Sequence, residues 1–226
     1  MKRQLNTLLA ICTLLLLPFV SAQAATQNFT VLKQKLARQT NLSQSAINMA
    51  FSGYNWALKQ HKVRNKNILT IVDFSLASYK KRLYVIDLNS GKVLMSLFVS
   101  HGKNSGENKP YATRFSNQPN SLESSLGVYV TRNSYYGKFK YALRLSGLES
   151  SNNKALSRAI VVHSANYAAP WFIKRYGYAG NSYGCFAVDP SQNARLINYI
   201  RNGSVLYAYA ASKKYLASTH IAAQQA

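Results

Sequence analysis

Seven short apolar runs between residues 68 and 210 constrain the fold of this chain more than any other feature. Each run is five to eight residues long, with the two-residue alternation or continuous apolar character that is typical of β-strands. The runs are Ile68–Phe74, Arg82–Leu88, Val93–Ser100, Gly127–Thr131, Tyr141–Leu145, Ala159–His163 and Val205–Ala210. A turn at residues 89–92 contains Gly91, which tolerates positive φ and predicts a hairpin over Leu83–Leu97. The chain is therefore expected to fold around a β-sheet.

Helical patterns lie on both sides of these runs. Phe29–Lys62 places apolar residues at three- and four-residue spacings, and Asn41 or Ser43 is a candidate cap for the second of two helices there. Asp189 is followed by a first-turn proline, which predicts a helix over Pro190–Ile200. The expected fold class is α+β and mainly β.

The N-terminal residues have the pattern of a secretory signal peptide. Lys2 and Arg3 precede an apolar stretch over Leu8–Val20, and a small-residue exit ends at Ala24. The stretch is shorter than the roughly 20 residues that cross a membrane, and no later segment approaches that length. We expect cleavage after Ala24, no transmembrane segment after removal of the signal, and an exported protein that is periplasmic or associated with the cell wall.

The chain is strongly basic, with 28 Lys and Arg against 6 Asp and Glu and a formal charge of +22. The charge is spread from Lys33 to Lys214, which indicates a polyanionic partner. An exported protein rarely meets nucleic acid, so we expect a cell-envelope polymer with carboxylates or phosphates. The alternative is that the charge mainly maintains solubility. The four scattered histidines have no metal-ligand spacing, and no metal is expected.

Cys185 is the one cysteine that remains after the segment containing Cys12 is removed, so no internal disulfide can form. Cys185 is either an inert buried side chain or a nucleophile, and its context favours the nucleophile. His163 ends an apolar run and can accept a thiol proton near neutral pH. Gly184 permits a tight bend that brings the amides of Tyr183, Gly184 and Cys185 together, as an oxyanion hole requires.

These residues resemble the motif of the cysteine L,D-transpeptidases of bacterial cell walls, which is a histidine, a variable loop and Ser-x-Gly-Cys. The motif corresponds here to His163, Ser182, Gly184 and Cys185. The closer likeness is to the murein L,D-transpeptidase catalytic domain family and covers roughly residues 68–209. It rests also on Ile71–Phe74, Lys81–Val85, Val99–Gly106, Phe115–Asn117, Ser124–Gly127, Leu143–Glu149 and Arg158–His163.

The resemblance implies an L,D-transpeptidase-like β-sandwich catalytic domain without a cofactor. It implies that Cys185 attacks the third residue of a peptidoglycan stem, releases D-Ala and transfers the acyl group to an amine. In the family, a backbone carbonyl commonly orients the histidine, so His163 needs no acidic partner. Water as the acceptor would make the protein an L,D-carboxypeptidase. A non-catalytic cationic cell-wall-binding protein and a general cysteine protease also stay open.

One departure from the family bears on substrate binding. Many relatives have an arginine two positions after the cysteine, where this chain has Ala187. Binding of the substrate carboxylate must therefore come from elsewhere, and Arg144 and Arg158 are candidates because guanidinium binds carboxylate with two hydrogen bonds.

Three more side chains are candidates for substrate binding. His101 follows a predicted strand and is expected to face the cleft, where it would orient Tyr183 or the substrate. Tyr167 and Trp171 belong to an aromatic loop over residues 166–180, which we interpret as a lid over the thioester.

The sequence also predicts how the chain is divided. We expect a signal peptide over residues 1–24, a helical N-terminal extension over 25–66, the catalytic domain over 67–212 and a loose tail over 213–226. The expected partner is peptidoglycan, and the sequence does not fix an oligomeric state.

Overall fold

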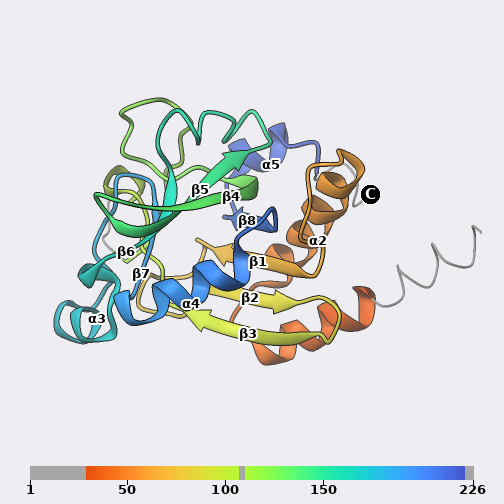
Figure 1. The fold of residues 1–226 in the computed structure, drawn as a ribbon, viewed down its shortest axis with the longest axis horizontal. Coiled ribbons are helices and arrows are strands. Elements are labelled where there is room, and N and C mark those ends of the chain that lie inside the picture. The colour runs from red at the N-terminus through yellow and green to blue at the C-terminus, as the bar shows by residue number, and fades with distance from the viewer. Residues whose placement is uncertain (1–28, 107–109, 222–226) are drawn as a thin grey trace, which may run out of the picture.

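The structure is a computed structural model that describes residues 29–106 and 110–221, so the predicted signal peptide lies outside the described residues. Its centre is a single eight-stranded sheet with the order β3-β2-β1-β8-β4-β5-β6-β7 (Figure 1). The strands are β1 Ile68–Asp73, β2 Leu83–Asp87, β3 Lys92–Leu97, β4 Gly127–Gly137, β5 Lys140–Gly147, β6 Val161–Ser164, β7 Phe186–Val188 and β8 Val205–Tyr209. Within the described part of the chain, no helix is both long and apolar enough to cross a membrane.

Each of the seven predicted runs overlaps a strand, and β4 continues to Gly137. The predicted hairpin is confirmed, since β2 and β3 pair antiparallel with Leu83 opposite Leu97. Gly91 has a φ of 63° in the connecting turn. Two pairs of neighbouring strands are parallel, β1 with β8 and β6 with β7. The sequence pattern missed β7, because three residues are too few to show a period.

The sheet bends so that the segment after β3 meets the segment around β7. Ser100 N–H donates to Ala187 O at 2.9 Å, and Gly102 forms an isolated parallel bridge with Ser182. Lys103 N–H then donates to Ser182 O at 2.8 Å. These bonds bring the two ends of the strand order together, which gives the fold a sandwich-like cross-section. The predicted α+β, mainly β class with helix before the sheet is confirmed.

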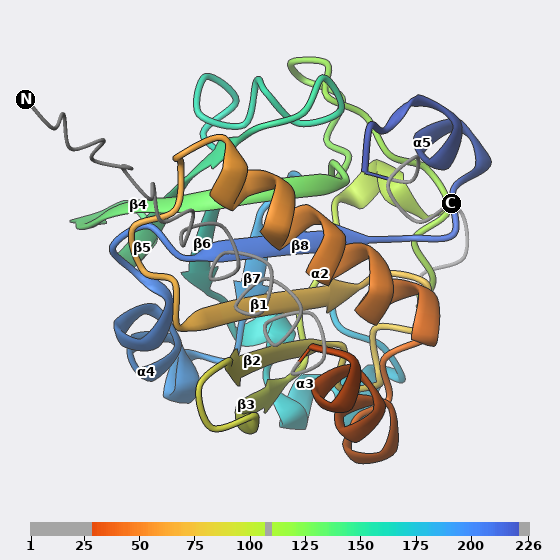
Figure 2. The same ribbon diagram turned by 90° about the vertical axis from the view of Figure 1, so that its right-hand side faces the viewer.

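Helix α2, Gln44–Lys59, packs on the sheet across β8 and β1 (Figure 2). A further helical segment precedes it over residues 29–39. Of the two candidate caps, Ser43 is the residue used, because its side chain accepts from Ala46 N–H. Phe51 is fully buried in the same core as the strands. Residues of α2 and of the sheet therefore form one core, although the sequence assigned them to an extension and a catalytic domain.

Helix α4, Pro190–Ile200, begins after Asp189 as predicted, and it contacts β1, β2, β5 and β6. Because helices cover them, β1 and β8 are buried along their whole lengths. The helices thus cover the middle of the sheet, and the site described below lies at the β5, β6 and β7 end.

The prediction of a loose tail is wrong for residues 213–221. Lys213–Ser218 forms helix α5, and the side chains of Tyr215 and Ile221 are buried. The buried carboxylate of Glu149 accepts hydrogen bonds from the hydroxyls of Tyr215 and Thr219 and from Val128 N–H. These contacts join α5 to the start of β4, which is a long-range interaction that the local sequence pattern does not indicate.

This arrangement predicts the effect of removing both hydroxyls around Glu149. The double substitution Tyr215→Phe and Thr219→Val leaves a buried carboxyl group with fewer donors, so we expect the free energy of unfolding to fall by about 2–4 kcal/mol. Urea denaturation measures the change. The control Lys213→Ala alters an exposed residue of α5 and is expected to stay within about 0.5 kcal/mol of the wild type. Equal stability of the double variant and the control would contradict the role given to Glu149.

Candidate functional site

The pairing of β6 with β7 places His163 and Cys185 on the same face of the sheet. His163 lies opposite Ala187 in the parallel register. Cys185 is two residues before Ala187, and Val161 is two residues before His163, so all four side chains alternate onto one face. The sheet thus brings together two residues that are separated by 22 positions in the chain.

Strands β4 and β5 extend this face. Arg144 lies opposite Val161 in the β5–β6 pair, which makes it a neighbour of the same face. Ala142, Val161 and Cys185 form a small apolar cluster separate from the main core, and Tyr135 packs against it. The guanidinium carbon of Arg144 lies 3.9 Å from the centre of the Tyr135 ring. A cation therefore lies beside the cluster that contains the thiol.

The imidazole of His163 is buried and fixed in one orientation. Its Nδ1 lies 2.9 Å from Ser164 O. Since a carbonyl oxygen only accepts, Nδ1 carries the proton and Nε2 is the free base in the neutral ring. The ring of Phe139 stacks on the imidazole with centroids 4.3 Å apart. Burial lowers the pKa of His163, so the ring is neutral at pH 7 and able to accept a proton.

Cys185 is 8% exposed, and its thiol donates to Ala159 O at 3.6 Å. Burial raises the pKa of the thiol, while the N–H of Val161 and the charge of Arg158 act in the opposite direction. The resting side chain is therefore a protonated thiol. Such a thiol becomes a nucleophile only when a base removes its proton during attack.

The turn before Cys185 requires glycine at position 184. Gly184 has a φ of 111°, and a Cβ there would lie 2.6 Å from Glu123 O. Ser182 Oγ donates to Cys185 O at 2.7 Å and accepts from Gly184 N–H at 3.1 Å. The Gly184 amide is thus already bonded to Ser182 Oγ, and its place in an oxyanion hole stays a prediction. The amides of Tyr183 and Cys185 are the remaining candidates.

His101 supports this turn from inside the protein. Its carbonyl accepts from Ser182 N–H at 3.0 Å, and its side chain is fully buried. Arg82 Nη2 lies 2.9 Å from His101 Nδ1, and Arg82 also donates to Val99 O and Leu76 O. Burial and the charge of Arg82 lower the pKa of His101 to about 3. The expectation that the His101 side chain faces a cleft is therefore wrong, while its carbonyl supports the turn before Cys185.

Arg158 was a candidate for binding a substrate carboxylate, but its guanidinium is bonded within the protein. Its guanidinium makes four hydrogen bonds with a single loop over residues 116–125, to Ser116 O, Ser121 Oγ, Glu123 O and Ser125 Oγ. The same loop supplies the carbonyl that contacts Gly184. Because these bonds occupy the guanidinium, Arg144 is the better candidate for a substrate carboxylate.

The aromatic loop over residues 166–180 contains two short helices, η2 Asn166–Ala168 and α3 Pro170–Tyr176. Gly180 N–H donates to Tyr167 O at 2.8 Å, which closes the loop on itself. Burial first, and then the nearby Cys185 thiol, raise the pKa of Tyr167 to about 12. Tyr167 therefore lies near the thiol, while Trp171 and Tyr183 are 56% and 70% exposed.

A hollow of about 520 Å³ adjoins His163. Its lining includes Phe139, which stacks on the imidazole, and Ser164, whose carbonyl binds Nδ1. Lys138 and Lys140 also line it. Sequence reasoning missed these three hairpin residues, although the run Tyr-Tyr-Gly-Lys-Phe-Lys at 135–140 combines aromatic and basic side chains. Within the described ranges no group of three or more His, Cys, Asp or Glu is placed to hold a metal ion.

Comparison with known proteins places these residues in a family. A family model described as the L,D-transpeptidase catalytic domain matches residues 38–209, which include every residue of the site. No curated protein matches this chain in sequence.

Three solved structures with a similar fold are distant in sequence from this chain. An L,D-transpeptidase from Mycobacterium smegmatis is 16% identical with a TM-score of 0.41, over 63% of this chain and 58% of that chain. L,D-transpeptidase 1 from Mycobacterium tuberculosis is 14% identical with a TM-score of 0.37, over 63% and 61%. An L,D-transpeptidase from Stackebrandtia nassauensis is 14% identical with a TM-score of 0.39, over 74% and 67%. The match spans about three fifths of the length of the first two proteins.

The environment of Cys185 predicts its reactivity toward iodoacetamide. Because burial raises the thiol pKa, we expect the midpoint of the pH–rate profile to lie above that of free cysteine, which is about 8.5. The measurement uses a Cys12→Ser variant, so that Cys185 is the one thiol present, and the same variant unfolded in urea is the control. A midpoint below that of the unfolded control would mean that the resting site holds a thiolate, contrary to this account.

Proposed function

We propose that this chain, which belongs to the L,D-transpeptidase catalytic domain family, is a cysteine L,D-transpeptidase that acts on peptidoglycan stem peptides. The observation that carries the proposal is that His163 of β6 and Cys185, which immediately precedes β7, alternate onto the same face of the sheet. Its second support is the bond from His163 Nδ1 to Ser164 O, which leaves Nε2 free as a base. Since peptidoglycan lies outside the cytoplasm, we also propose that the protein acts there.

The first half-reaction acylates the enzyme. His163 Nε2 takes the thiol proton while Cys185 Sγ attacks the carbonyl carbon of the third stem residue. We assign the amides of Cys185 and Tyr183 to the resulting oxyanion, since both belong to the turn that carries the sulfur. The peptide bond to the terminal D-Ala then breaks, and the imidazolium returns its proton to the leaving amine. A thioester and free D-Ala remain.

The second half-reaction transfers the acyl group. An amine from a neighbouring stem attacks the thioester and gives a proton to His163 Nε2, and the thiol takes that proton as it leaves. Because Cys185 is 8% exposed in a small apolar cluster, water has little access to the thioester. This environment favours an amine acceptor over hydrolysis.

Substrate carboxylates need cations near the thiol, and Ala187 supplies none. Arg144 lies on the same face as Cys185, while Lys138 and Lys140 line the hollow beside His163. We assign Arg144 to the donor stem because it lies beside the thiol cluster, and the two lysines to the acceptor stem.

Tetrapeptide muropeptides with diaminopimelate at the third position test the proposed reaction. Wild-type protein is expected to form dimers that have lost one D-Ala, and Cys185→Ala and His163→Ala are expected to form none. The usual pKa of histidine is about 6.5, and burial lowers the pKa of His163. We therefore expect kcat/KM to fall on acidification with a midpoint below pH 6.5. Product masses and a pH profile measure both expectations.

The other products have defined meanings. Tripeptides without dimers would make the protein an L,D-carboxypeptidase. No product from the wild type, while an active family member converts the same substrate, would favour a non-catalytic cell-wall-binding protein.

Arg144 provides a test of the proposed carboxylate site. Replacing it with methionine keeps a long side chain at this position and removes the guanidinium that lies over Tyr135, so we expect KM for the donor to rise about tenfold with kcat little changed. Arg132→Met is the matched control, since Arg132 is exposed on β4 and bonds Ser146 Oγ. Equal KM values for the two variants would remove Arg144 from the site.

A further inference from the structure

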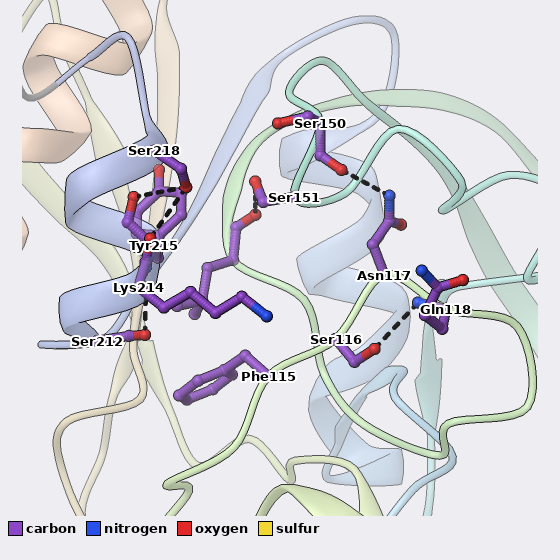
Figure 3. Close-up of a pocket in the computed structure, with 11 residues that line it drawn as sticks. Phe115, Ser116, Asn117, Gln118, Ser150, Ser151, Ser212, Lys214, Tyr215 and Ser218 are labelled. Carbon is purple, nitrogen blue, oxygen red and sulfur yellow. Dashed lines mark hydrogen bonds between the residues drawn. The ribbon is translucent and has the colours of Figure 1, made fainter.

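Two of the pockets outside the candidate site differ in whether their polar groups are already bonded. One lies between the loop at residues 115–118, the loop at residues 150–151 and helix α5 (Figure 3). There Asn117 Nδ2 donates to Ser150 O at 2.8 Å, and Ser218 Oγ donates to backbone carbonyls of α5. Because these side chains are bonded within the protein, this pocket has few donors left for a ligand.

The other pocket has a volume of about 440 Å³ and lies where the loop after α2 meets β4 and the turn before β8. It shares no residue with the candidate site or with the hollow beside His163. Three of its side chains are those of Lys or Arg, and none of its described lining residues is acidic. The lining consists of His61, Lys62, Arg64, Val130, Thr131, Arg132, Asn133, Asn202 and Gly203. The proposed reaction does not use this basic pocket.

A β-bulge in β4 supplies one wall of the basic pocket. The pairing of β4 with β5 shifts between Thr131 and Ser134, so Arg132 and Asn133 together face one residue of β5. A bulge redirects side chains from the regular alternation of a strand, and bulges are frequent beside functional sites. The bulge thus presents two neighbouring exposed residues to the pocket, where a regular strand presents one.

The base of the basic pocket is held by hydrogen bonds between the three segments. Gly203 O accepts from Arg64 N–H at 3.0 Å and from Asn65 N–H at 3.2 Å. Thr131 Oγ1 accepts from Gly203 N–H at 3.2 Å and donates to Ile200 O at 2.7 Å. Gly203 has a φ of 86°, and a Cβ there would lie 2.8 Å from Arg64 Cβ. The backbone therefore fixes the positions from which the cationic side chains extend.

The cationic groups of this pocket are available to a ligand. Arg132 uses one N–H, which donates from Nη1 to Ser146 Oγ at 3.2 Å. Among the described residues, no carboxylate lies within ion-pair distance of Lys62, Arg64 or Arg132. In the same part of the chain, the side-chain amides of Asn133 and Asn202 have no hydrogen-bond partner. The pocket therefore offers several unused donors together with three positive charges.

This donor set favours a phosphate ester over a carboxylate. A phosphate monoester carries a charge of about −1.5 to −2 at pH 7 and three acceptor oxygens, and guanidinium groups bind it with paired hydrogen bonds. The volume falls within the range of ligand pockets, roughly 300–1,000 Å³, and leaves room for the group that carries the phosphate. Val130 is the one aliphatic hydrophobic side chain in the described lining, and it is buried. The carrier is therefore hydroxylated rather than an acyl chain.

We propose that the basic pocket binds a phosphate ester of a sugar or polyol. Lys62, Arg64 and Arg132 bind the phosphate, and the amides of Asn133 and Asn202 bind hydroxyl groups of the carrier. This binding does not depend on the proposed function, because the pocket shares no residue with the site of Cys185.

An NMR titration of the ¹⁵N-labelled full chain at constant ionic strength tests this binding. The probes are glucose 6-phosphate, the carboxylate glucuronate and neutral glucose. We expect glucose 6-phosphate to shift the amide signals of residues 61–65, 130–134 and 201–204, with glucuronate binding at least about tenfold more weakly and glucose causing no shifts. Arg132→Gln is expected to weaken binding of glucose 6-phosphate about tenfold.

Arg195→Gln is the matched control, because Arg195 is an exposed cation of α4 that does not line the pocket. It removes the same charge and is expected to change the affinity by less than about twofold. Cys185→Ala is expected to bind glucose 6-phosphate as the wild type does, so the pocket and the proposed reaction are tested separately. Unchanged amide signals outside the pocket show that each variant is folded.

Four results would overturn the inference. They are the absence of these shifts with glucose 6-phosphate, equal affinity for glucuronate, equal loss of affinity in the Arg132 and Arg195 variants, and binding to phosphatidylglycerol vesicles without binding of the soluble ester. The last result would identify a lipid surface as the partner in place of a sugar or polyol phosphate.

Discussion

The hydroxyl and backbone of Ser182 form the contacts on which both the sheet and the site depend. Ser182 N–H and C=O bond the segment that follows β3, through His101 O and Lys103 N–H, and so join the two ends of the strand order. Its Oγ bonds Cys185 O and Gly184 N–H on the other side. One residue therefore contributes to both the closure of the sheet and the position of the turn that carries the thiol.

The candidate site combines two buried, uncharged side chains, Cys185 and His163, with the cations of Arg144 and Arg158 nearby. Burial raises the pKa of Cys185 and lowers that of His163, so both reacting groups are uncharged at rest. The charge of Arg158 opposes the first of these shifts, which means that it stabilises the thiolate once the proton has moved. Arg144 lies by the Tyr135 ring at the same face. In the reaction proposed above, negative charge develops on the sulfur beside these two cations.

Most strands, the β2–β3 hairpin and the motif residues could be predicted, because each rests on a local pattern of period, turn or spacing. The contacts that determine the roles of individual side chains could not be predicted. The engagement of Arg158 by one loop, the burial of His101 and the seating of Tyr215 on Glu149 all join residues far apart in sequence. A single sequence shows which side chains are present. It does not show which of their donors and acceptors are already bonded to other groups in the folded protein.

Arg82 shows how the scaffold stays constant while the reaction moves protons. It is fully buried, and its guanidinium bonds Val99 O, Leu76 O and His101 Nδ1 beside the Phe74 ring. Burial lowers the pKa of Arg82 to about 9, which leaves it charged at neutral pH. Because burial first, and then the charge of Arg82, lower the pKa of His101 to about 3, the support beneath Ser182 does not titrate between pH 5 and 8. A change in rate across that range therefore reports on the reacting groups rather than on this support.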